Sequence, residues 1–291
     1  MTFARLCLLI ACAVLLGACA RVSPPPPFLA PASNSAEAND AWERFATIAV
    51  RAENTTGPFR ASGTLFYSGK EDSQRVSYYF WGNSDKKSLL PLRLDILMGH
   101  GQLLGRVRED SRGFNIFVPA EDTLFTHSSS GGLLAFGVPF PFSLAELASL
   151  VTGRYAQAFA IPGADITSHI PPAFASPDNT FIYEITGAPM GGRVCISPEG
   201  LPISWQENAE NGWMLTIEYW PDSTRPTPRK LYIRHPHGNE ATLIVRELVK
   251  PETPFTPEQL ALTVPAGTRT ESLGAPGAKA ASALRVPEKN K

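Results

Sequence analysis

The residue with the most evident chemistry is Cys19, at the end of the stretch Leu16-Gly17-Ala18-Cys19. The single charge of Arg5 precedes an apolar run, residues 6–16, which is too short to cross a bilayer and is followed by small residues. This order is typical of a bacterial lipoprotein signal, in which the cysteine becomes the first mature residue and carries acyl chains. We therefore expect residues 1–18 to be a signal peptide and Cys19 to be a lipid anchor. An uncleaved anchor or an ordinary signal peptide is the alternative.

Other residue patterns that could support chemistry are weaker. His235 and His237 are spaced to share one face of a strand and could hold a metal, but no third ligand follows, and a hairpin end is favoured. His127 precedes three serines, residues 128–130, without the Gly-x-Ser-x-Gly turn that exposes a catalytic serine. The glycines from Gly99 to Gly105 miss the dinucleotide-binding spacing and indicate a turn. We expect no enzymatic activity, no metal and no cofactor.

The charge balance argues against a nucleic-acid partner. The chain has 26 basic and 27 acidic residues and a net charge of −1, without a run of lysine or arginine. Two of the four cysteines lie in the expected signal peptide, and Cys19 would be acylated. Only Cys195 remains, which excludes an intrachain disulfide in the mature protein. We expect Cys195 to be a small, buried apolar residue on a strand.

Composition divides the rest of the chain into a tether, a folded domain and a tail. Residues 19–39 contain four consecutive prolines and then alanine, serine and asparagine, which predicts an extended tether. Residues 271–291 are rich in alanine, glycine, proline and lysine, with little to bury, and we expect a disordered tail. Residues 40–270 remain as one folded domain.

The sequence predicts two helices in this domain. Apolar residues recur at helical spacing over residues 35–50, with Trp42 and Phe45 among them. Ser143 followed by Glu146 forms a capping-box pattern that begins a second helix, which Gly153 ends.

Most of the domain shows the alternation of short β-strands. The expected strands are residues 59–67, 75–81, 89–97, 102–108, 113–118, 180–186, 192–196, 202–206, 213–219, 229–234, 240–248 and 260–264. In residues 76–81 both faces are partly apolar, so the second face needs a cover or an apolar ligand. We predict a mainly β (α+β) fold: a single antiparallel, incompletely closed barrel of about eleven strands with a helical lid over an apolar cavity.

Several short stretches resemble LolB, the outer-membrane receptor that takes lipoproteins from a periplasmic carrier. They are Trp42, residues 63–67, residues 79–81, residues 92–99 leading into residues 103–105, and residues 140–153. The resemblance covers roughly residues 42–219 and implies an unclosed barrel with helices over an apolar cavity. In the family an apolar residue protrudes from the loop before a glycine, and the matching positions here are Leu97 and Met98, before Gly99. A longer loop at residues 163–179, a long second half and the tail depart from the family pattern and put the cargo and partner in doubt.

Alternation and the resemblance together give the predicted binding residues. We expect the cavity to be lined from both halves of the sheet, and Leu97 and Met98 to be exposed at a hairpin tip that acts on the membrane. Because a one-residue register error reverses every side chain, the opposite set of residues is the alternative. The expected lining residues are Phe66, Tyr78, Phe80, Leu92, Leu94, Leu104, Trp205, Leu215 and Ile217.

These features predict a function in the cell envelope. We expect a monomeric protein, anchored to the periplasmic face of the outer membrane, that binds acyl chains of lipids or lipoproteins and helps insert lipoproteins. Its expected partners are lipid acyl chains, a LolA-like periplasmic carrier and the outer membrane. The absence of Asp after Cys19 supports the outer membrane by analogy. The alternative is a structural or assembly lipoprotein that uses the same fold to hold a protein partner.

Overall fold

The structure is a computed structural model that describes residues 36–53, 57–69, 73–84, 89–99, 101–128, 131–160, 165–166, 170–175, 178–209, 212–221 and 227–273. The chain divides into two units, Met1–Ala30 and Pro31–Lys291, and every described residue belongs to the second. The expected signal peptide and Cys19 lie outside the described residues, as do most of the expected tether and tail. Residues 36–39, which we placed in the tether, begin a helix, and residues 271–272, which we placed in the tail, end a strand.

The described residues form one mixed sheet of 14 strands, not the eleven expected. Its order is β14-β6-β5-β4-β3-β2-β1-β13-β12-β11-β10-β9-β8-β7, so β14 and β7 are free edges and hydrogen bonds do not close the sheet. All pairs are antiparallel except β14 with β6. The strands are β1 Phe59–Ser68, β2 Ser73–Gly82, β3 Leu92–Leu97, β4 Leu103–Asp110, β5 Gly113–Val118, β6 Thr123–His127, β7 Ala173–Ala175, β8 Phe181–Ile185, β9 Gly192–Ile196, β10 Pro202–Gln206, β11 Met214–Tyr219, β12 Pro228–Arg234, β13 Glu240–Val249 and β14 Arg269–Ser272.

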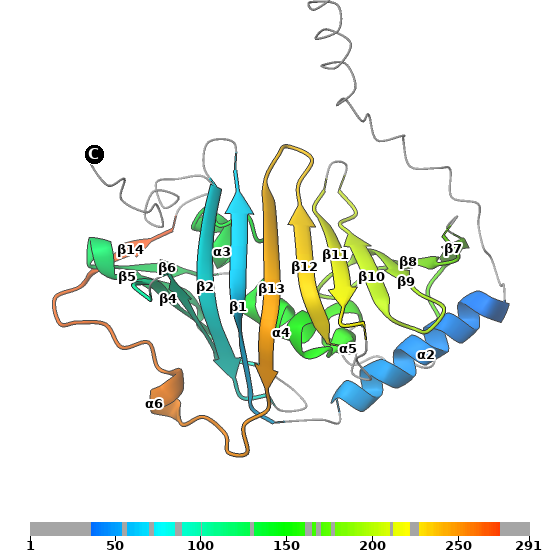
Figure 1. The fold of residues 1–291 in the computed structure, drawn as a ribbon, viewed down its shortest axis with the longest axis horizontal. Coiled ribbons are helices and arrows are strands. Elements are labelled where there is room, and N and C mark those ends of the chain that lie inside the picture. Colours follow the sequence, from blue (N-terminus) through cyan, green and yellow to red (C-terminus); the bar gives the residue numbers. More distant parts are fainter. Residues whose placement is uncertain are drawn as a thin grey trace, which may run out of the picture. The chain divides into compact units, whose positions relative to one another are not determined.

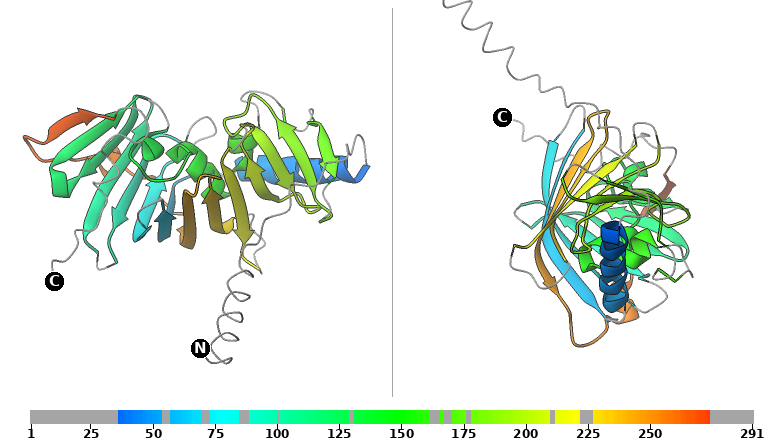
Figure 2. Two further views of the ribbon diagram at one scale, coloured as in Figure 1. Left: turned by 90° about the horizontal axis from the view of Figure 1, so that it is seen from above. Right: turned by 90° about the vertical axis from the view of Figure 1, so that its right-hand side faces the viewer.

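The sheet curves around three short helices, which lie against its inner face (Figures 1 and 2). The longer helix α2 packs beside them at the β8–β9 end, where the Tyr183 hydroxyl donates to the carbonyl of Ala38 at 2.5 Å. A last helix, α6, follows β13 and contacts the outer face, where the Gln259 carbonyl accepts from the Trp81 indole N–H. In the described parts of the chain no helix is long and apolar enough to cross a membrane. The helices are α2 Ala36–Glu53, α3 Gly132–Ala135, α4 Leu144–Thr152, α5 Tyr155–Phe159 and α6 Pro257–Leu260.

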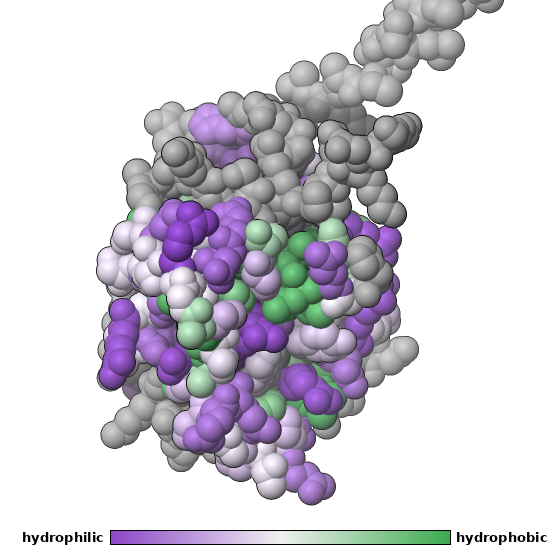
Figure 3. Space-filling view, turned by 90° about the vertical axis from the view of Figure 1, so that its left-hand side faces the viewer, coloured by the Kyte–Doolittle hydropathy of each residue, from purple (hydrophilic) through white to green (hydrophobic). Residues whose placement is uncertain are grey.

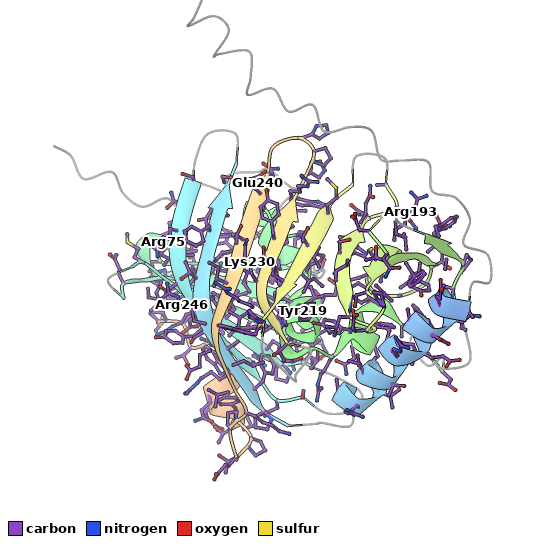
Figure 4. The ribbon with its side chains drawn as sticks, turned by 45° about the vertical axis from the view of Figure 1, so that its right-hand side comes forward. Arg75, Arg193, Tyr219, Lys230, Glu240 and Arg246 are labelled. Carbon is purple, nitrogen blue, oxygen red and sulfur yellow. The ribbon has the colours of Figure 1, made fainter. Side chains whose placement is uncertain are left out.

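Alternation along the strands separates an apolar inner face from a polar outer face. In β2, Val76, Tyr78 and Phe80 are buried, whereas Arg75 before them and Tyr79 between the last two are exposed. On β12 and β13 the outer face carries Lys230 and Glu240, shown in Figure 4. The inner residues join those of the helices in one apolar core. The second face that we expected to need a cover carries Tyr79 and Trp81 and is the outer one, where the Trp81 indole N–H donates to the Gln259 carbonyl of α6 but Tyr79 stays 49% exposed.

The two halves of the sheet meet where β1 pairs with β13. A bulge between Ser62 and Gly63 shifts the register of this pair. A Cβ atom on Gly63 would lie 1.8 Å from the Ile244 carbonyl oxygen and 3.0 Å from Cε1 of Tyr78. Only glycine fits this contact, because any side chain would collide with backbone. The central seam of the sheet thus depends on Gly63.

The sequence predicted most of the strands but not the edges of the sheet. The expected strand at residues 260–264 is wrong, because α6 and an irregular stretch occupy that region. The edge strands β7 and β14 were not predicted, and neither was β6. The two helices predicted from periodicity and capping correspond to α2 and α4.

Candidate functional site

An enclosed apolar site lies between the inner face of the sheet and residues 132–151. The space between them is about 10 Å³ when measured as the volume open to the centre of a water molecule, which is room for about one water. The expected cavity for an acyl chain is therefore not open in this conformation, because the side chains of helix and sheet fill it. The void is lined by Leu65, Tyr78, Leu94, Ile96, Leu133, Val138, Phe140, Leu147 and Leu243.

Local sequence explains how residues 132–151 reach the sheet. Gly132 begins α3 directly above the ring of Phe114, where a Cβ would lie 2.1 Å from the ring. The irregular connection between α3 and α4 then places Phe140 in the interior, fully buried. Ser143 begins α4 with a capping box, since its hydroxyl accepts from the Glu146 N–H at 3.0 Å while Glu146 accepts from the Ser143 N–H at 2.8 Å.

One carboxylate joins this segment to the sheet. Glu109 projects inward from β4, is 5% exposed, and accepts a hydrogen bond from the Leu144 N–H at 2.6 Å. Among the described residues, this bond is the one hydrogen bond that a side chain forms between residues 132–151 and the strands. Burial raises the pKa of Glu109 to about 7, and the bond from Leu144 opposes that rise in part. The rest of the contact between the segment and the strands is apolar.

Tyr78 is the polar exception in the wall of the void, and its hydroxyl is satisfied. The hydroxyl donates to the Ile244 carbonyl oxygen at 3.3 Å across the position left open by Gly63. Burial raises the pKa of Tyr78 above its usual range, so the phenol stays neutral. The ring therefore presents an apolar surface to the void.

The structure brings most of the predicted lining residues to the inner face but few of them to the void. Only Tyr78 and Leu94 line it. Phe66 was wrongly assigned, because it pairs with Arg75 on the outer face, where the guanidinium lies 5.1 Å from the ring. Leu104 is buried but unpaired at an irregularity between β3 and β4. The other predicted residues are buried in the core: Phe80, Leu92, Trp205, Leu215 and Ile217.

The expected membrane-insertion residues lie where β3 leads into β4. A tight turn follows, with the Met98 N–H donating to the Gln102 carbonyl at 2.8 Å. Met98 is only 8% exposed and belongs to the core, so the expectation that it is exposed at the tip is wrong. Leu97 is half-buried and pairs with Ser77 on the outer face. The turn exists as predicted, but its large apolar residue folds inward.

Sequence reasoning missed Glu109 and Phe140. A signal for Glu109 was present, because alternate residues of β4 are apolar or small up to Val107, and Glu109 is the next in that series. A charged residue at an inward position indicates a specific partner. Phe140 gave no comparable signal, since residues 136–142 show no regular period.

The other chemical candidates stay apart from this interface. His235 and His237 lie in the turn after β12 with ring centres 4.9 Å apart, and among the described residues no group of three potential metal ligands occurs. Cys195 lies on β9, half-buried, with its sulfur 3.1 Å from the Thr180 hydroxyl. Burial raises the pKa of this thiol, which favours its protonated form.

Comparison with known proteins gives similarity in structure only. No protein family model matches the chain, and no curated protein matches it in sequence. Among solved structures, a LolA superfamily protein from Nitrosomonas europaea is 12% identical, with 72% of this chain and 94% of that chain covered and a TM-score of 0.42. A DUF1329 family protein from Desulfovibrio piger is 13% identical, with 73% and 94% covered and a TM-score of 0.43. LprF from Mycobacterium bovis is 7% identical, with 74% and 96% covered and a TM-score of 0.28. None of these three is described as LolB.

Proposed function

We propose that this protein is an outer-membrane-anchored envelope protein that binds acyl chains of lipids or lipoproteins between its sheet and residues 132–151, and that it helps insert lipoproteins. The structure described here is then the closed form. Cys19 is the proposed anchor, and a LolA-like carrier is the proposed donor of cargo.

The observation that carries this proposal is the makeup of the contact between the segment and the sheet. All nine residues around the void are apolar or, for Tyr78, have a satisfied hydroxyl. Beyond the bond from Leu144 to Glu109, no side-chain hydrogen bond joins residues 132–151 to the strands in the described part of the chain. Apolar contacts are not directional, so an acyl chain can replace them without leaving polar groups unpaired.

The energetics favour an exchange of this kind. Burying each methylene of an acyl chain contributes about 0.8 kcal/mol, so a chain of about fifteen carbons gains on the order of 10 kcal/mol. Separating the segment from the sheet exposes apolar surface that the chain then covers. Only open molecules bind, so the apparent affinity for an acyl chain equals the affinity of the open form multiplied by the fraction of molecules that are open. A lowered affinity suits a protein that must release its cargo to a bilayer.

The alternative, a scaffold that holds a protein partner through its sheet edges, has less support. Among the described strands the two edges are β7, of three residues, and β14, of four residues. Such short edges offer few backbone hydrogen bonds to an added strand.

The test is to enlarge the void and measure acyl binding. Phe140→Ala removes a phenyl ring from the wall of the void and leaves a larger apolar cavity. Dry apolar cavities of this kind take up apolar ligands. We expect the variant to bind a fluorescent fatty acid several-fold more tightly than the unchanged protein. Native mass spectrometry should show one fatty acid per chain.

Phe45→Ala is the matched control. Phe45 lies on α2, is equally buried, and does not line the void. Its truncation costs comparable stability without enlarging the proposed site. If both variants bind fatty acid equally, or if neither they nor the unchanged protein bind any, the interior is a core and not a container.

A further inference from the structure

A second site lies on the opposite face of the sheet, as a groove of about 350 Å³. It is bounded by strands β1 to β3 and by residues 250–261, here called the α6 segment. It is shallow and widely open to solvent, so a ligand can reach it directly. The groove is lined by Arg60, Tyr79, Trp81, Asp95, Phe255 and Gln259.

Strand register places the polar and aromatic side chains of the groove side by side. Arg60 is directly opposite Trp81, and Tyr79 is directly opposite Asp95. Paired residues share a face, and these four alternate with the inward-facing residues of the same strands. The groove is therefore separate from the void, and acyl binding does not use it. Figure 3 shows the side of the molecule that carries β4 to β6 and α6, where most of the described surface is hydrophilic.

The wall formed by the α6 segment is held in place by specific bonds. The Asn83 side chain donates to the Phe255 carbonyl and accepts from the Phe255 N–H, each at 2.8 Å. The Trp81 indole N–H donates to the Gln259 carbonyl at 3.3 Å. The groove is thus formed before any ligand arrives, which reduces the ordering cost of binding.

Two charged groups in the groove keep capacity for a ligand. Asp95 accepts from Arg93 through Oδ1 at 2.9 Å and forms a longer ion pair through Oδ2, 3.9 Å from Arg106 Nε, which leaves Oδ2 able to accept a hydrogen bond from a ligand. None of the ion pairs among the described residues includes Arg60. Tyr79 between them is 49% exposed, so its ring is accessible to a ligand.

Arg60 and Asp95 together favour a ligand that carries both a negative and a positive charge. A free anion would meet the carboxylate of Asp95, and a free cation would meet the guanidinium of Arg60. A molecule with a phosphate and an ammonium satisfies both, because arginine binds phosphate through its N–H fork and aromatic faces attract an ammonium. We propose that the groove binds the headgroup of a zwitterionic membrane phospholipid, with its phosphate on Arg60 and its ammonium between Asp95 and Tyr79.

The surroundings favour a bilayer as the source of this headgroup. Arg75 and Arg246 are exposed (Figure 4); Arg75 lies on β2, outside the groove lining, and Arg246 lies on β13, the neighbour of β1. Such exposed cations draw a protein surface toward phosphates. The expected anchor at Cys19 would hold the protein within a tether's length of the membrane.

The experiment is a calorimetric titration of the full chain held in nanodiscs of phosphatidylglycerol, which lack an ammonium headgroup. The probes are glycerophosphoethanolamine, ethanolamine and inorganic phosphate. We expect the zwitterion to bind at least fivefold more tightly than either single ion. Arg60→Gln and Tyr79→Ala should each weaken it at least fivefold, while Arg75→Gln, a neighbouring exposed arginine outside the groove, should not.

A second nanodisc, containing phosphatidylethanolamine, tests the source. The lipid headgroups should compete and lower the apparent affinity for glycerophosphoethanolamine. Equal affinity in both nanodiscs would overturn the membrane lipid as occupant. Equal binding of inorganic phosphate, or unchanged binding in Arg60→Gln and Tyr79→Ala, would overturn the site itself. Because the acyl site lies on the other face, Phe140→Ala should leave this titration unchanged whether or not acyl binding exists.

Discussion

The Glu109 carboxylate accepts a hydrogen bond from the backbone N–H of Leu144 at 2.6 Å inside the apolar core. The bond joins β4 to the first turn of α4, where a negative charge is favoured by the helix dipole. Burial nevertheless penalises the ionised form and raises the pKa of Glu109 to about 7. The attachment of α4 to the sheet is therefore linked to pH near neutrality.

The first prediction concerns this pH dependence. The folded-state pKa of Glu109 is above the ordinary value of 4.5, so the folded protein binds this proton more tightly than the unfolded chain. Its contribution to stability is fully present below pH 4.5 and is lost as the pH rises to about 7. Glu109→Gln should raise the free energy of unfolding by about 1 to 3 kcal/mol at pH 8 and by much less at pH 5. Urea denaturation at the two pH values measures both.

Glu43→Gln is the control for this prediction, because Glu43 is exposed on α2. This substitution should change the free energy of unfolding only slightly, and by the same amount at pH 5 and at pH 8. A Glu109→Gln variant that is less stable than the unchanged protein at pH 8 would mean that the charged bond to Leu144 outweighs the cost of burial.

The second prediction concerns the seam between the halves of the sheet. Gly63→Ala places a Cβ 1.8 Å from the Ile244 carbonyl oxygen, so the backbone must move and Tyr78 loses its position. We expect a loss of about 3 kcal/mol or more in thermal or urea unfolding. Gly99→Ala, with nothing within 4 Å of its added Cβ, should change stability by less than about 0.5 kcal/mol. Similar stability of the two variants would contradict the close contact between Gly63 and the Ile244 carbonyl.

The third prediction follows from the buried position of Met98. Met98→Asp places an unpaired charge in the core and should lower the free energy of unfolding by about 3 kcal/mol or more. Leu97→Ser, at a half-buried position on the outer face, should cost less than about 1.5 kcal/mol. Circular dichroism melting curves compare the two. If Met98→Asp melts like the unchanged protein, the side chain is exposed at the tip.

The fourth prediction concerns the α6 segment. Asn83→Ala removes both hydrogen bonds to Phe255 and leaves a backbone N–H and carbonyl without these partners. We expect a loss of about 1 to 3 kcal/mol and faster cleavage of residues 250–261 by a protease. Asn208→Ala, at an exposed position, serves as the control and should be cleaved at the unchanged rate.

Local patterns in the sequence predicted the elements whose signals are local. Ser143 and Glu146 predicted the start of α4, which forms the capping box. Thr256 and Gln259 carry the same signal, with Pro257 at the first helical position, and it marks α6 in the region where we expected a strand. This capping-box pattern could have predicted α6, but the apolar residues that follow it favoured a strand at residues 260–264.

Long-range features could not be read from the sequence. The face on which Phe66 lies depends on its pairing with Arg75, and the position of Leu104 depends on an irregularity between β3 and β4. A shift of one residue reverses every side chain, and no local pattern fixes it. Whether the interior is open or filled depends on how Phe140 and Leu147 pack against the sheet, which arises only in three dimensions.

The most direct test of acyl binding is hydrogen exchange of the full chain in nanodiscs, with and without a saturating fatty acid. We predict faster exchange across residues 132–151, including the Leu144 amide released from Glu109, with unchanged exchange in β1 and β13. Those two strands form the central pair of the sheet and are the internal control. A fatty acid that binds while residues 132–151 stay fully protected would contradict opening at this interface.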